Sequence, residues 1–326
     1  MKNVLVIGGA GYVGTHLVES LIEKNYKVTV YDLFLYGNFF QENQNLSLIK
    51  GDIRNLENLR KVIKNKFDCI IHLACISNDP SFDLDPQLGK SINFDPFEEL
   101  VKISKDGGVA KFIYASSSSV YGIKSESDVD ENFSLEPLTD YSKYKAMCED
   151  ILLKYNDKNF TCCIVRPATV CGYSKRQRLD VVVNILTNLA YHNRKITIFG
   201  GPQLRPNINI NDMTNAYIFL ISQNPDSISG EIYNVGFENY SVNKLGELVV
   251  KNIDAKVEVE NIKSIDDRSY HISSKKIQND LGFKTNFTIE NAIVDLIGAF
   301  KKNLFNNPLQ NEIYFNIKRM NSIKLK

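Results

Sequence analysis

The chain has 326 residues, a formal net charge of +1 and 43% hydrophobic residues. Its length suits one large α/β unit or two unequal lobes, and its near-neutral charge argues against a nucleic-acid or membrane surface. The first apolar run reaches glycine after about four residues, which is too short for a signal peptide or a membrane span.

Strands and helices alternate through the first half of the sequence. Apolar runs predict strands at 3–7, 27–31, 46–49, 68–72, 110–115 and 160–165. Helical patterns lie between them, near 12–24, 55–65, 90–106 and 141–155. Such alternation implies parallel strands joined by right-handed crossovers. We therefore predict an α/β fold with a doubly wound parallel sheet of the Rossmann type, whose ligands bind at the carboxyl ends of the strands.

Beyond Pro167 the alternation becomes irregular. The sequence predicts a helix near 178–192, strands at 195–199, 208–210 and 231–235, and helices at 241–253 and 288–303. From Ile313 onward the chain carries lysine and arginine without acids, and we expect a solvated end rather than a binding patch. These patterns predict a dinucleotide-binding domain, 1–172 with returning segments near 207–236, and a smaller mixed α/β substrate lobe, 173–206 and 237–326.

Six cysteines occur without C-x-x-C spacing or partner histidines: Cys69, Cys75, Cys148, Cys162, Cys163 and Cys171. We expect them to be reduced and mostly packed, as in a cytoplasmic protein, and we expect no metal site. Cys162 and Cys163 are neighbours in a predicted strand and should point to opposite faces of the sheet.

The first predicted strand runs directly into a glycine-rich turn, and a helical stretch follows. This order is typical of dinucleotide binding. Gly8 and Gly9 allow the tight turn, and Gly11 lets the backbone approach a pyrophosphate at the helix N-terminus. Gly14 lets the helix pack closely on the strand. The second predicted strand leads to Asp32, whose carboxylate suits an adenosine ribose and repels a 2′-phosphate, so the sequence predicts NAD rather than NADP.

A candidate catalytic group follows the predicted strand at 110–115. Ser116 to Ser119 come at the carboxyl end of this strand and should face the ligand crevice. Tyr141 and Lys145 are four residues apart in a predicted helix, so they share one face. We predict that Tyr141 takes the proton from a sugar hydroxyl while a hydride leaves the same carbon for NAD⁺. Ser117 would orient the same oxygen.

This role requires a low pKa of the tyrosine hydroxyl, which ordinarily titrates near 10. A cation about 5–6 Å away, at an effective dielectric constant near 20, stabilises the phenolate by roughly 3 kcal/mol, or about two pK units. The nicotinamide cation would add a similar effect, while desolvation opposes both. We therefore expect Lys145 and the nicotinamide cation together to bring the pKa of Tyr141 towards neutrality.

Taken together in this order along the chain, these motifs resemble those of the extended short-chain dehydrogenase/reductase family, which includes nucleotide-sugar epimerases and dehydratases. The resemblance covers nearly the whole chain. The resemblance implies that Ser117, Tyr141 and Lys145 are the catalytic triad. It also implies contacts to adenine, to the back of the cofactor and to nicotinamide. The residues concerned are Gly8, Gly11, Tyr12, Val13, Asp32, Asp52, Ile53, Leu73, Ala74, Asn93, Tyr141, Lys145, Arg166 and Pro167.

The same resemblance implies residues that bind a nucleotide-diphosphate sugar. Arg205 matches an arginine that clamps the diphosphate, and Arg268 belongs to a second diphosphate-side segment, since a guanidinium fork suits a phosphate. Thr169 stands where the family often has asparagine. The stretch 174–184 resembles bacterial polysaccharide enzymes that include GDP-heptose 4-dehydrogenases. The further candidate substrate contacts are Ser118, Ser119, Thr169, Arg176, Arg178 and Asn184.

The residues after Ser117 reduce the number of reaction types to be considered. The 4,6-dehydratases of the family place an acid pair at the positions of Ser118 and Ser119, so we disfavour dehydration. The 3,5-epimerase/reductases need a cysteine–histidine pair and usually prefer NADPH, which Asp32 disfavours. A 4-epimerase returns the hydride to the other face of the sugar, whereas a 4-dehydrogenase releases the keto sugar. Both reactions remain open, and we place the epimerase slightly ahead.

Two further expectations concern the protein as a whole. A non-catalytic NAD-sensing regulator on the same fold would usually lack the tyrosine or the lysine, and this chain has both. The apolar faces of the helix after Tyr141 and of the stretch 90–104 correspond, in this family, to helices of a dimer's four-helix bundle. We therefore predict a homodimer, with the alternative that these faces simply cover the sheet.

Overall fold

A seven-stranded parallel sheet is the centre of the computed structural model, which describes residues 2–263, 269, 271–323 and 325. Its strands are β1 (Asn3–Ile7), β2 (Lys27–Asp32), β3 (Leu46–Lys50), β4 (Cys69–His72), β5 (Lys111–Ala115), β6 (Thr161–Pro167) and β10 (Glu231–Val235). The spatial order is β10-β6-β5-β4-β1-β2-β3, and every neighbouring pair is parallel. The predicted doubly wound sheet is confirmed. Strand order reverses beside β1, where such sheets bind ligands.

Helices cover both faces of this sheet because β1 sends alternate apolar side chains to opposite sides. Val4 and Val6 pack with α1 (Tyr12–Glu23) and α8 (Ile210–Ser222). Leu5 and Ile7 belong to the opposite core. That core also takes in α2 (Leu56–Ile63), α4 (Pro86–Asn93), α5 (Phe97–Asp106) and α6 (Asp140–Lys154). Cys163 lies in the first core and Cys162 in the second, which confirms their opposite orientation.

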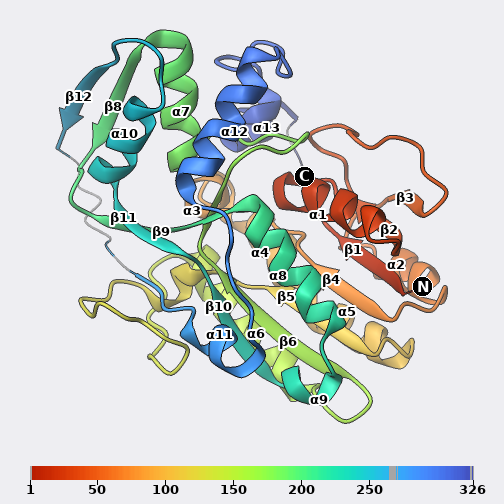
Figure 1. Ribbon diagram of the computed structural model, residues 1–326. Coiled ribbons are helices and arrows are strands. Elements are labelled where there is room, and N and C mark those ends of the chain that lie inside the picture. Colours follow the sequence, from red (N-terminus) through yellow and green to blue (C-terminus); the bar gives the residue numbers. More distant parts are fainter. Residues whose placement is uncertain (1, 264–268, 270, 324, 326) are drawn as a thin grey trace.

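A smaller set of elements lies together at the upper left of Figure 1, away from the large sheet. There β8 (Lys195–Phe199) pairs with β12 (Glu258–Ile262). The helices α7 (Val182–Asn193), α10 (Val242–Lys251) and α12 (Ile289–Lys301) supply most of the core around β8. A separate three-stranded sheet is formed by β7 (Thr169–Cys171), β9 (Leu204–Asn209) and β11 (Glu238–Ser241). The remaining α-helices are short: α3 (Asp79–Phe82), α9 (Pro225–Ile228), α11 (Lys275–Leu281) and α13 (Asn316–Ile323). Two 3₁₀ helices span Ser118–Tyr121 and Glu312–Tyr314.

Three of the predicted segments differ from the structure in their bounds or their type. The stretch 90–106 contains parts of two helices, α4 and α5, because Pro96 stands at the boundary, where its missing N–H is tolerated. The strand predicted at 208–210 ends at Asn209, whose side chain accepts a hydrogen bond from Asn211 and begins the unpredicted helix α8. The helix predicted from 178 begins only at Val182.

The expectation of a solvated C-terminal segment was wrong. This segment forms α13, and Asn316 at its start is only 3% exposed. Arg319 donates a 2.6 Å hydrogen bond from Nε to the carbonyl of Leu35, in the loop after β2. The Arg319 side chain therefore helps to dock this segment on the loop after β2, whereas Lys318 stays exposed. Across the described residues, none of the helices combines the length and apolar character needed to cross a membrane. The six cysteines are free thiols, five of them buried.

Candidate active site

One cavity of about 410 Å³ opens at the carboxyl ends of the central strands. It is lined by Ile7 of β1, Asp32 of β2, Ala115 of β5 and Pro167 of β6. The cavity brings together most residues that the sequence singled out: Gly8, Gly11, Tyr12, Val13, Asp32, Ile53, Leu73, Ala74, Ser117, Ser118, Ser119, Tyr141, Lys145, Pro167, Thr169, Arg176 and Arg178.

The glycine-rich turn fits a pyrophosphate at the N-terminus of α1. A Cβ on Gly14 would lie 2.5 Å from the carbonyl oxygen of Gly8, so close packing of the helix requires glycine there. A Cβ on Gly11 would meet only the Gly8 oxygen, at 3.4 Å. The protein's own packing therefore does not demand glycine at 11, and its absent side chain keeps the helix end open. Gly11 is the N-cap and provides no side-chain hydrogen bond to the first amides of α1, which suits a ligand phosphate.

Backbone hydrogen bonds hold the carboxylate of Asp32 beside the glycine-rich turn. Its carboxylate accepts backbone hydrogen bonds from Ala10, at 2.9 Å, and from Phe34, at 2.7 Å. Burial raises the pKa of Asp32, while these two amides and the nearby Arg176 oppose the shift. The carboxylate is thereby fixed in orientation within the cavity, as recognition of a ribose diol requires.

Ser117, Tyr141 and Lys145 reach the cavity from two elements. Ser117 follows β5 and is the N-cap of a short 3₁₀ helix, where its Oγ lies 2.8 Å from that of Ser119. Tyr141 lies in the first turn of α6, which a capping box of Thr139 with Ser142 begins. Lys145, one turn later, places Nζ 5.9 Å from the centre of the Tyr141 ring. The arrangement matches a tyrosine base with a neighbouring cation and a hydroxyl donor.

Burial dominates the pKa of Tyr141 in the protein without ligands. Burial raises this pKa well above its usual value, and Cys75 and Asp79 add to the increase. Arg178 and a hydrogen bond from Ser117 lower it, but they do not outweigh burial. In the protein without ligands, Lys145 alone thus does not bring the pKa of Tyr141 towards neutrality. Burial disfavours the phenolate more than the Lys145 ammonium favours it, because the hydrogen bond of this ammonium goes to the carbonyl of Ala115.

Behind the triad lies a buried ion pair that joins three elements. Arg166, at the end of β6, donates to Glu149 of α6 from Nη2, at 2.6 Å, and from Nε. Both side chains are less than 5% exposed. Arg166 also donates to the Tyr121 hydroxyl at 2.7 Å, and Ser116 donates to Glu149. Burial alone would lower the pKa of Arg166, but pairing with Glu149 raises it. The Arg166 side chain therefore supports the segment that follows β5, from Ser116 to Tyr121, and does not line the cavity.

Several other sequence-predicted residues also lie outside the lining of this cavity. Asp52 pairs with Arg54 at 2.6 Å, although its neighbour Ile53 lines the cavity. Asn93 exchanges two hydrogen bonds with the backbone of Ile76, at 2.8 and 3.0 Å, and so shapes the loop after β4. Asn184 is buried and binds the Gly172 amide and the Tyr12 hydroxyl.

Two arginines predicted to bind the substrate diphosphate have different outcomes. Arg205, in β9, donates to the carbonyl of its neighbour Leu204 at 3.1 Å and does not line the cavity. Arg268 lies outside the described residues.

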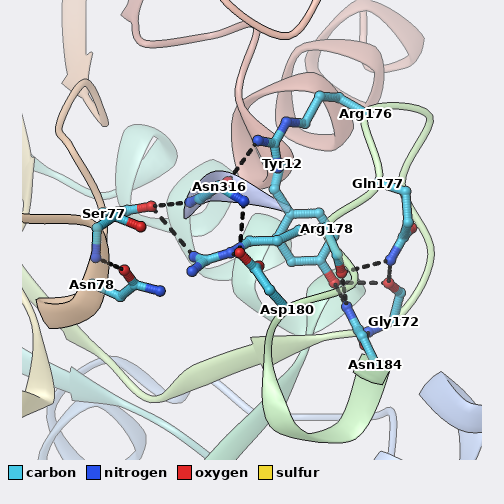
Figure 2. Close-up of polar contacts among 11 residues, drawn as sticks. Tyr12, Ser77, Asn78, Gly172, Arg176, Gln177, Arg178, Asp180, Asn184 and Asn316 are labelled. Carbon is cyan, nitrogen blue, oxygen red and sulfur yellow. Dashed lines mark hydrogen bonds and ion pairs between the residues drawn. The ribbon is translucent and has the colours of Figure 1, made fainter. Parts of the chain in front are cut away.

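Sequence reasoning missed the wall of the cavity formed by Tyr36, Ser77, Asn316 and Leu325. Figure 2 shows Asn316 between Ser77, Asp180 and the two arginines of the loop before α7. No local pattern marks these residues. Glu149, also missed, does carry a signal, because it follows Lys145 by four residues on the same helix face.

Comparison with known proteins gives consistent matches along the chain. Residues 4–236 match the model of the NAD dependent epimerase/dehydratase family. The dTDP-D-glucose 4,6-dehydratase of Mus musculus is 29% identical, covering 94% of this chain and 90% of its own length. A putative UDP-glucose 4-epimerase of Methanocaldococcus jannaschii is 27% identical, covering 92% of this chain and 99% of its own. Among solved structures, MoeE5 in complex with UDP-glucuronic acid and NAD has a TM-score of 0.81 at 26% identity, covering 92% of this chain and 99% of that one.

Proposed function

The chain belongs to the NAD dependent epimerase/dehydratase family, and on this premise we propose that it is a nucleotide-sugar 4-epimerase of bacterial polysaccharide biosynthesis. NAD is its cofactor. The observation that carries the proposal is the lining of one cavity by the glycine-rich turn, Asp32 and the triad of Ser117, Tyr141 and Lys145. A cofactor bound along the turn would end beside these three side chains.

In this proposal Tyr141 removes the proton from the C4 hydroxyl of the sugar. Ser117 holds the same oxygen, and its hydrogen bond lowers the pKa of Tyr141. Lys145 contributes a positive charge that favours the phenolate. The chemistry that NAD⁺ supplies when bound is acceptance of a hydride from C4, which the reduced form returns to the opposite face of the keto sugar.

Dehydration is disfavoured although a 4,6-dehydratase is among the relatives. Removal of a proton at C5 and expulsion of water at C6 need an acid and a base beside the sugar. Ser118 and Ser119 occupy the positions after the catalytic hydroxyl, and Ser119 is hydrogen-bonded to Ser117. Neutral hydroxyls titrate too far from neutrality to replace a carboxylate pair.

The second candidate is a 4-dehydrogenase that releases the keto sugar and passes the hydride to another acceptor. The stretch 174–184, whose sequence resembles such enzymes, contributes to the same cavity as the triad. Arg178 lies near enough to influence the pKa of Tyr141. On the sugar side we propose Ser118, Ser119 and Thr169 as contacts, and Arg205 for the diphosphate. We also propose that Asn184 contacts the substrate and that Arg268 lies on the side of its diphosphate, as the resemblance implies.

The proposal is tested with the purified, NAD-loaded protein and a panel of UDP-, dTDP-, GDP- and CDP-sugars in deuterated water. Each reaction is run with and without a 2-keto acid acceptor, and products are examined by mass spectrometry and NMR. An unchanged mass with inverted C4 supports the epimerase. Acceptor-dependent loss of two hydrogen atoms supports the dehydrogenase instead. Loss of water with deuterium at C5 overturns both, and no product with any sugar favours the NAD-sensing regulator.

We also propose that two copies associate through α4, α5 and α6. Met147, on α6, is 44% exposed, and Ile151 on the same helix is partly exposed. Exposed apolar groups on one helix suit an interface between copies. Light scattering at micromolar concentration tests this proposal, and a monomer mass would contradict it.

A further inference from the structure

The loop between β7 and α7 is fastened to the glycine-rich turn. The Tyr12 hydroxyl, from the first residue of α1, donates to the Gly172 carbonyl at 2.7 Å. Ser174 donates back to the Tyr12 carbonyl at 2.9 Å. Arg176 and Arg178, which follow in this loop, line the cavity. Two guanidinium groups thus extend from a loop that contacts the first turn of α1, where a phosphate would sit.

Both guanidinium groups retain hydrogen-bond donors that the described residues do not satisfy. Arg176 is 2% exposed, and its Nε has no partner. The Arg178 side chain is 11% exposed, and its Nη2 has no partner. Buried donors are rarely left unpaired, because each loses its hydrogen bonds to water. These nitrogens therefore suit an acceptor group of a ligand.

The local charge also suits an anion. Asp180 accepts hydrogen bonds from Arg178 Nε at 2.6 Å and from the backbone N–H of Asn316 at 2.7 Å. Within the described part of the chain no carboxylate is hydrogen-bonded to Arg176, whose Nη2 donates to the side-chain oxygen of Asn316 at 2.9 Å. Burial lowers the pKa of Arg176 to about 10, and the neighbouring Arg178 adds to this decrease. A bound anion would offset both effects.

We propose that Arg176 and Arg178 bind the pyrophosphate of NAD from the side opposite to the glycine-rich turn. The guanidinium of Arg176 stacks 3.6 Å above the ring of Tyr36, in the loop that follows Asp32. Its charge also lowers the pKa of Asp32, on the ribose side. This placement favours the cofactor's pyrophosphate over the diphosphate of the sugar nucleotide. The inference rests on NAD as the cofactor and not on the reaction proposed.

Helix α13 completes this site through Asn316, which acts as a positioning residue. The Asn316 side chain binds Arg176 through Oδ1 and Ser77 through Nδ2, at 2.9 and 3.0 Å. Ser77 in turn accepts from Arg178 Nη1 at 3.3 Å. Figure 2 shows Asn316 joined to Arg176 and Ser77, and Ser77 joined in turn to Arg178. The arginines are thus held in place by a helix from the far end of the described chain.

The test uses Arg176→Gln, with Arg176→Lys as a charge-preserving variant and Arg60→Gln as a matched control at an exposed ion pair. NADH dissociation from the loaded protein is followed by fluorescence on dilution into excess NAD⁺. Titrations then compare ADP with adenosine, and UDP and GDP measure the sugar-nucleotide side. Loss of a charge-assisted hydrogen bond should weaken NADH and ADP binding by about 10- to 100-fold in Arg176→Gln, with adenosine unchanged. Arg176→Lys should recover part of this loss, and Arg60→Gln should behave as the parent.

Asn316→Ala separates positioning from folding. It should speed NADH dissociation and reduce the preference for ADP over adenosine, which mere loosening of the fold would not do selectively. Equal losses for ADP and adenosine would overturn the proposal. A loss confined to UDP and GDP would assign the arginines to the sugar nucleotide and would also overturn it. None of these measurements requires turnover, so failure of the proposed reaction would leave the inference testable.

Discussion

The ammonium of Lys145 donates a 2.7 Å hydrogen bond to the carbonyl of Ala115, two residues before Ser117. The same ammonium lies 4.9 Å from the centre of the Tyr114 ring. These contacts join α6, which carries Tyr141, to the strand end that carries Ser117. The lysine therefore fixes the spacing of the triad as well as supplying charge.

Replacing Tyr141 with phenylalanine should abolish most turnover while NAD binding persists. Loss of a positioned acid–base group typically reduces the rate by about 10²- to 10⁴-fold. The measurement is the initial rate of sugar conversion, with NADH binding followed by fluorescence. Tyr144→Phe is the matched control, because Tyr144 lies on the same helix and stacks on Phe94 outside the cavity lining. A Tyr141→Phe enzyme with the parent rate would contradict the proposed base.

The rate should rise with pH through the neutral range. Burial raises the pKa of Tyr141, and only the deprotonated hydroxyl acts as the base, so alkaline conditions increase the active fraction. Ser117→Ala removes a hydrogen bond that lowers this pKa, so the rising limb should move to higher pH. Profiles of kcat/KM for both proteins test the sign. A limb that moves to lower pH, or does not move, would contradict the assignment.

Asp32→Asn should weaken the preference for NAD over NADP. The substitution keeps one acceptor for the amides of Ala10 or Phe34 but removes the charge that repels a 2′-phosphate. The ratio of NADPH to NADH dissociation constants should fall by at least about tenfold, equivalent to roughly 1.4 kcal/mol. Asp106→Asn, at an exposed position, is the control. An unchanged ratio would remove Asp32 from cofactor selection.

Glu149→Gln should destabilise the fold severely, because it leaves the buried charge of Arg166 without a counter-ion. Breaking a buried ion pair in this way typically lowers the free energy of unfolding by about 3–5 kcal/mol. Glu99→Gln, which breaks an exposed pair with Arg60, should lower it by less than about 1 kcal/mol. Urea titrations compare the two variants with the parent. Similar small losses in both would show that Arg166 finds another partner.

Much of the candidate site could be predicted from the sequence because its residues belong to local patterns. The glycine spacing, the serines after β5 and the four-residue interval from Tyr141 to Lys145 each follow from one strand end or one helix face. Parallel strands then bring their carboxyl ends to one edge, so these local motifs converge. The cavity joins Ser117 to Tyr141 for this reason.

The remaining features depend on contacts between distant residues. Asn316 and Ser77 are 239 positions apart, and neither carries a pattern that predicts their hydrogen bond. A basic segment without acids gave no hint that Arg319 of α13 would bind the carbonyl of Leu35. The pKa of Tyr141 likewise depends on how completely the fold excludes water, which spacing alone cannot indicate.

The docking of α13 has a consequence for biosynthesis. Arg319 contacts Leu35 across 284 positions, so nearly all of the described chain must be synthesised before α13 can form its side of the cavity. Nascent domains begin to fold from the N-terminal side. The large sheet can assemble while translation continues, whereas a finished enclosure around the coenzyme has to await α13.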